Sequence, residues 1–88
     1  GVTTGNIEEA EDATDRILVA SPNDSDALLV KGLIALAKRR MDQAIRYADR
    51  ALAARPDNEN ARILKARSLY LKGDAPAALT TIGGGEAG

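Results

Sequence analysis

The chain has 88 residues with 12 basic and 13 acidic side chains, so its net charge of −1 argues against a general nucleic-acid or anionic-membrane binder. No run of about 18 apolar residues occurs, which excludes a membrane-spanning helix. The absence of histidine and cysteine removes the usual general base, the thiol nucleophile and the soft metal ligands, so we expect no enzyme, no cofactor and no metal site.

The first predicted helix lies before Pro22, which ends it. Apolar residues between Ile7 and Leu18 recur at three- and four-residue spacing. We interpret the acidic residues opposite them as a solvated face that complements the helix dipole, and a hard-cation site is the alternative. These residues are Glu8, Glu9, Glu11, Asp12 and Asp15. Residues 1–4 are expected to be a disordered or cloning-derived start.

A second helix is predicted from about Ser25 to Lys38, after cap residues in the Asn23–Ser25 turn. Between residues 27 and 37 only Lys31 is charged, and apolar side chains point in nearly every direction. A helix of this kind is expected to be buried on all sides. A third helix is predicted from about residue 42 to 54, and Pro56 just after it prevents its continuation.

Residues 57–59 open the fourth predicted helix, and Asp74 precedes the fifth. The fourth ends at residues 72–73, where Gly73 suits the left-handed conformation just past a helix end. Asp74 caps the fifth helix, and Pro76 is tolerated in its first turn. Residues 83–88 lack periodicity and are expected to be a flexible glycine-rich tail. Patterns of period two are absent, so the chain is predicted to be all-α with about five helices.

The sequence also repeats itself at an offset of 34 positions. Residues 21–24 recur as residues 55–58, and Lys31 recurs as Lys65. Alanine occupies three positions at this spacing: Ala10, Ala44 and Ala78. A fixed period of this length is typical of stacked repeat proteins, so we expect a fragment of a longer array.

With these features the chain resembles the tetratricopeptide repeat family, whose units are helix-turn-helix hairpins of 34 residues. In the family's pattern, residues 5–24 are the second helix of a partial repeat, residues 25–58 a complete repeat and residues 59–82 a second partial repeat. The resemblance implies a right-handed α-solenoid of antiparallel helical hairpins. It also places small or turn residues at six structural repeat positions: Gly32, Ala44, Ala51, Pro56, Ala66 and Ala78. Close helix contacts require such small side chains, and Ala10 falls on the same interhelical position as Ala44.

The family's first helices line a concave protein-binding surface, so the resemblance implies a candidate face made of residues from the second and fourth helices. These are Leu29, Val30, Leu33, Leu36, Ile63, Leu64, Arg67 and Tyr70. Members that bind chaperone tails carry a charged clamp at such places. Here only Arg67 keeps a charge, so that activity is not carried over.

The predicted function is a non-catalytic protein-protein interaction scaffold within a larger protein. One alternative is a regulatory or assembly domain of an enzyme or of a bacterial envelope secretion machine. Another is nucleic-acid binding through Lys38-Arg39-Arg40. This alternative is disfavoured because the chain has only two aromatic residues on which bases could stack. The partner is expected to be another protein or peptide, and both a cytoplasmic and a periplasmic location fit.

The apolar second helix leaves three interpretations open. A preceding helix in the intact protein could cover it, it could be an apolar peptide groove, or it could make the isolated fragment a homodimer. We expect Leu29, Leu33 and Leu36 to face the place of the absent preceding helix, and self-association through this face is the testable prediction.

Overall fold

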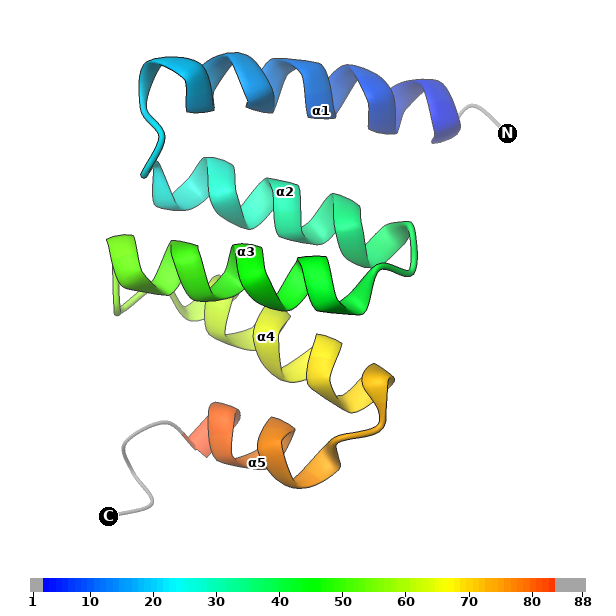
Figure 1. The fold of residues 1–88 in the computed structure, drawn as a ribbon, viewed down its shortest axis with the longest axis vertical. Helices are drawn as coiled ribbons and strands as arrows, with labels where there is room; N and C mark the ends of the chain where they lie inside the picture. The colour runs from blue at the N-terminus through cyan, green and yellow to red at the C-terminus, as the bar shows by residue number, and fades with distance from the viewer. Residues whose placement is uncertain (1–2, 84–88) are drawn as a thin grey trace.

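The computed structural model describes residues 3–83, which form a row of helices joined by short turns (Figure 1). The helices are α1 (Thr3–Ala20), α2 (Ser25–Ala37), α3 (Met41–Ala54), α4 (Glu59–Lys72) and α5 (Ala75–Gly83). Each helix packs against the next one along the chain, and α2 also contacts α4. The described part of the chain contains no strand. The predicted all-α solenoid of helical hairpins is therefore confirmed.

Local capping chemistry sets most of the helix boundaries. Asp24, Asn58 and Asp74 each accept a hydrogen bond from the backbone N–H three residues further on, at 2.9, 3.2 and 3.2 Å. These bonds satisfy donors that have no partner inside the helix. Gly73 adopts a φ of 105°, the left-handed conformation predicted for the end of α4. The predicted boundaries of α2 to α4 consequently differ from the observed ones by two residues at most.

Both ends of the described chain differ from the sequence-based expectation. Helix α1 begins at Thr3, so the expected disordered start at residues 1–4 is wrong for Thr3 and Thr4. Helix α5 runs to Gly83, which was expected to begin the flexible tail. The expectations for residues 1–2 and 84–88 lie outside the described residues.

The core lies where α2, α3 and α4 meet. Leu28 and Leu64 fill its centre, and a row of alanines on α3 lies fully buried beside them. The row consists of Ala44, Ala48 and Ala51. Small side chains here allow close approach of the helix axes.

Helices α2 and α4 pack closely at Gly32. A Cβ atom added to it would collide with Cδ2 of Leu64 and would lie 3.3 Å from Cβ of Tyr47. Leu64 therefore projects from α4 into a notch that only glycine leaves open on α2. Through this notch α2 and α4 are in direct contact.

Polar contacts tie the same helices together at one end. Ser25 donates a hydrogen bond to the carbonyl of Ala51 at 2.7 Å, and the side-chain amide of Asn58 donates to the Ser25 hydroxyl at 2.8 Å. Asn58 is itself buried, and its oxygen caps α4. One buried amide thus joins the starts of α2 and α4 to the end of α3.

Ala10 shows a different environment from that of its repeat counterparts. Ala44 and Ala78 are buried, whereas Ala10 is exposed, so its predicted interhelical packing is wrong. Among the described helices α1 packs only against α2. The side of α1 that carries Ala10 has no helix against it.

Candidate protein-interaction surface

Helices α2 and α4 form a shallow groove of about 180 Å³ between them. We call it the α2–α4 groove. Six residues line it: Leu29, Leu33, Asn60, Ile63, Leu64 and Arg67. Leu33 and Ile63 are 45% and 50% exposed, so their apolar side chains form its accessible surface. The groove brings together five of the eight residues that were predicted for the concave face.

The other three predicted residues lie elsewhere. Val30 is half-buried and does not line the groove, and Leu36 is half-buried against the core. Tyr70 is exposed and lines a second groove on the far side of α4. Asn60, which lines the α2–α4 groove, was missed; its place two turns before Arg67 on the same helix is the signal that could have found it.

The expected exposure of the second helix is mostly wrong. Leu29 is buried and Leu36 is half-buried, so of the three leucines only Leu33 is exposed. Helices α1, α3 and α4 all pack against α2 and cover its apolar sides. The buried α2 agrees instead with its lack of charged residues on nearly every side.

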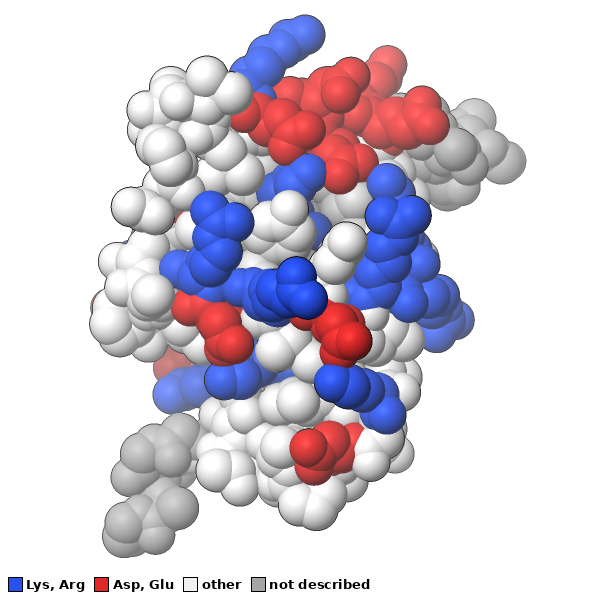
Figure 2. All heavy atoms as spheres, in the orientation of Figure 1, with Lys and Arg blue, Asp and Glu red and all other residues white. Residues whose placement is uncertain are grey.

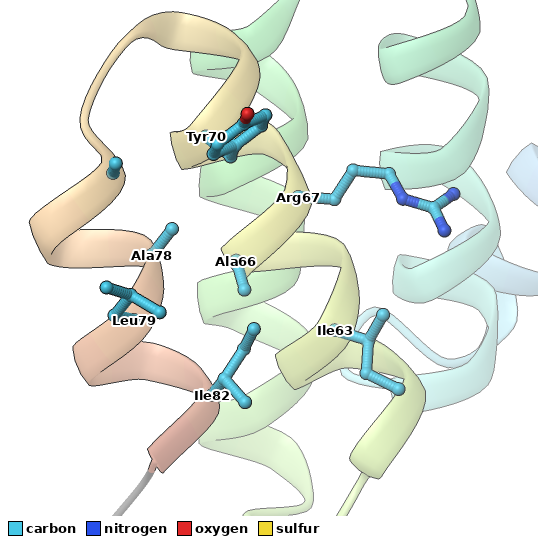
Figure 3. Close-up of a pocket in the computed structure, with 8 residues that line it drawn as sticks. Ile63, Ala66, Arg67, Tyr70, Ala78, Leu79 and Ile82 are labelled. Carbon is cyan, nitrogen blue, oxygen red and sulfur yellow. The ribbon is translucent and has the colours of Figure 1, made fainter.

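The second groove lies between α4 and α5 and has a volume of about 390 Å³ (Figure 3). We call it the α4–α5 groove. Its lining is apolar except for one arginine: Ile63, Ala66, Arg67, Tyr70, Ala75, Ala78, Leu79 and Ile82. In Figure 3 Ile82 points across the groove toward α4, while the guanidinium of Arg67 extends away from α5. The residues of α5 were not predicted as surface residues, although its lack of charge was the available signal.

Ion pairs join each first helix to the helix before it. The ammonium group of Lys31 lies 2.8 Å from Glu11 and 2.9 Å from Asp15, and Lys38 also contacts Glu11 at 3.0 Å. These hydrogen bonds, the one from Lys31 foremost, lower the pKa of the Glu11 carboxyl. Burial opposes the charge on Lys31, but its bonds to the two carboxylates outweigh the burial and leave its pKa raised.

The same pairing recurs one repeat later. Lys65 contacts Asp49 at 2.8 Å, and Lys72 contacts Asp42 at 2.7 Å. The bond from Lys72 lowers the pKa of the Asp42 carboxyl. Arg67, by contrast, forms no ion pair with any residue in the range 3–83. It is the charged group of the α2–α4 groove that is available to a ligand.

Charged side chains are unevenly distributed on the surface, although carboxylates also lie among the basic side chains over the middle of the molecule in Figure 2. Figure 2 shows the acidic groups of α1 at one end and Lys and Arg side chains over the middle of the molecule. Within the predicted cluster at residues 38–40, Lys38 is engaged by Glu11. The nearby Tyr47 ring has the charged groups of Lys31 and Arg50 each 5.8 Å from its centre. These cations occupy the surroundings of an aromatic ring that a nucleic-acid base would need for stacking.

Residues 3–83 contain no group of three or more acidic side chains that could hold a metal ion. The acidic residues of α1 are instead spread along the helix, and two of them bind Lys31. Within the same range, no helix has the length and apolar character that crossing a membrane requires.

Two sequence profiles described as tetratricopeptide repeat match the chain, one over residues 2–59 and the other over residues 35–86. The chain therefore belongs to the tetratricopeptide repeat family. Repeats of this family are generally protein-protein interaction modules, and the fold is typically a non-catalytic scaffold. Neither the curated proteins nor the solved structures that were searched gave a match.

Proposed function

We propose that the chain is a non-catalytic module of a larger scaffold and that it binds a segment of another protein in the α2–α4 groove. The observation that carries this proposal is the combination of half-exposed Leu33 and Ile63 with Arg67, which makes no ion pair within residues 3–83. Apolar contacts supply affinity, and a charged hydrogen-bond donor at the edge supplies orientation. Family membership supports the general role.

The composition of the groove defines the preferred ligand. Leu33 and Ile63 favour an apolar side chain, and the guanidinium of Arg67 favours a carboxylate, which it can bind through parallel hydrogen bonds. Asn60 adds an amide that can both donate and accept. The expected ligand is therefore a peptide segment that carries an apolar residue close to an acidic one.

Selection from a random-peptide display library tests this ligand directly. The parent chain is expected to enrich peptides that pair an apolar with an acidic residue. Calorimetric titration of one enriched peptide into Leu33→Lys and Arg67→Ala should show an affinity loss of about tenfold or more in each, because an interface anchor of this kind is worth over 1 kcal/mol.

Arg46→Ala is the matched control, because Arg46 is exposed on α3 outside the α2–α4 groove. It should bind the same peptide with the parent's affinity. Enrichment of no peptide, or equal affinities for Arg46→Ala and Arg67→Ala, would remove the support for this groove as the binding site.

A further inference from the structure

The end of the molecule formed by α4 and α5 has an unusually apolar surface. Three side chains there are more than half exposed: Tyr70 at 66%, Leu79 at 71% and Ile82 at 61%. They border the α4–α5 groove, whose one charged lining residue is Arg67. Contiguous exposed apolar surface on a soluble chain is usually covered by a partner.

The repeat itself indicates what kind of element fits this groove. Its lining residues Ile63, Ala66 and Ala78 lie 34 positions after Leu29, Gly32 and Ala44. That earlier surface, between α2 and α3, is covered by α4, whose Leu64 enters the notch at Gly32. The surface between α2 and α3 is thus covered by a helix, and a helix is the element expected to fit the equivalent α4–α5 groove.

The charges around the two surfaces differ. Helix α4 is held on α3 by the ion pairs of Lys65 with Asp49 and of Lys72 with Asp42. The positions 34 residues after these two aspartates are Gly83 and Pro76, and α5 has no charged residue at all. A helix that docks on α5 needs an apolar side and gains nothing from the lysines that α4 carries.

Helix α5 itself has these properties. It is uncharged, and its Leu79 and Ile82 are 71% and 61% exposed. We propose that two copies of the chain pair through this end, with α5 of each copy lying in the α4–α5 groove of the other. The surface is self-complementary, as a two-fold interface requires. No like charges oppose each other along α5, and the Arg67 side chain extends away from it (Figure 3).

Sedimentation equilibrium of the 88-residue chain over a concentration series tests the pairing. The parent is expected to show a reversible monomer-dimer equilibrium. Leu79→Lys should weaken the dimer by about tenfold or more. The substitution removes a leucine that the dimer would bury and introduces an ammonium group at the interface. Because Leu79 is exposed in the single chain, this variant keeps its helical circular dichroism.

Two controls separate this interface from others. Val19→Lys changes an 85% exposed residue on α1 and should leave the dissociation constant unchanged. Leu33→Lys changes the α2–α4 groove and not the α4–α5 groove, so it should weaken peptide binding by about tenfold or more without affecting the dimer. Failure of the dimer and failure of the proposed peptide site are therefore distinguishable.

Salt dependence provides a second measurement. Apolar pairing through α5 should be as strong at high sodium chloride as at low, whereas association of the acidic α1 with the basic middle of another copy would weaken with salt. A monomeric parent at the highest concentrations overturns the proposal. So does a dimer that Leu79→Lys leaves intact, or one that dissociates as salt is raised.

Discussion

The surface between α2 and α3 and the groove between α4 and α5 are formed by residues 34 positions apart, but only one of the two is covered by a further helix. The first is filled by α4, while the second is open within the described structure. Their lining differs in a telling way, because Gly32 of the filled surface corresponds to Ala66 of the open one. Where the leucine enters, an added Cβ would overlap with its Cδ2 and the leucine would have to shift; where none enters, a Cβ is present. Packing by a neighbour, rather than helix propensity, explains the glycine.

The largest expected effect comes from a charge placed in the filled surface. Ala44→Glu buries an unpaired carboxylate where the alanine is fully enclosed, and should lower the free energy of unfolding by about 4 kcal/mol. Ala10→Glu makes the same change at the exposed repeat counterpart and should shift it by less than about 0.5 kcal/mol. Urea denaturation measures both. Equal midpoint shifts would contradict the difference in packing.

Removal of the side chain that fills the notch comes next. Leu64→Ala should destabilise the chain by about 3 kcal/mol, because it deletes a buried side chain and leaves a cavity beside Gly32. Leu79→Ala truncates a leucine that is 71% exposed on α5, and its cost should stay within about 0.5 kcal/mol. Thermal denaturation at a concentration where the chain is monomeric compares the two, and similar losses would argue that Leu64 is not the central core residue.

Acidic pH should weaken the attachment of α1. The folded-state pKa of Glu11 is lowered from 4.5, so its stabilising contribution is present above about pH 4.5 and is lost as the pH falls through the lowered pKa. At neutral pH Glu11→Gln should cost about 1 kcal/mol, and the difference from the parent should vanish in acid. Urea titrations at several pH values measure this, with the exposed Glu9→Gln as the control. A pH-independent difference would contradict the assigned role.

The smallest expected change is a gain. Ser68 is fully buried on α4, and its hydroxyl has no hydrogen-bond partner among residues 3–83. The residue 34 positions earlier is the buried Ile34. Ser68→Ala should raise the free energy of unfolding by about 0.5–1 kcal/mol, because it removes an unpaired polar group. Ser21→Ala, in an exposed turn, should have no measurable effect. A destabilised Ser68→Ala would show that the hydroxyl has a partner in solution.

The positions of the helices were predictable from the sequence because their boundaries depend on local chemistry. Pro22 and Pro56 mark the turns, and the side chains of Asp24, Asn58 and Asp74 cap the helices that follow. Each of these signals acts within a few residues. Boundaries from α2 to α4 were accordingly predicted to within two residues.

Exposure could not be predicted in the same way, since it depends on which helices lie alongside. The repeat pattern assigned Ala10 and Ala44 to one environment, yet among the described helices α3 packs against both α2 and α4, whereas α1 packs against α2 alone. The repeat pattern also predicted that Leu29, Leu33 and Leu36 face the place of an absent helix, whereas Leu29 is buried. The large apolar groove was missed for the same reason: the sequence of α5 is short and uncharged, and only its place beside α4 makes Leu79 and Ile82 a surface.

The notch at Gly32 also sets how far α4 can slide along α2. One helical turn to either side of Leu64 lie Asn60 and Ser68, so a slip of one turn would push an amide or a hydroxyl into an apolar slot. Such a slip leaves a polar group buried without a partner, and the leucine is the one residue of the three that fits. A single missing side chain thereby determines the axial offset between repeats, and with it the pitch at which a longer superhelix would climb.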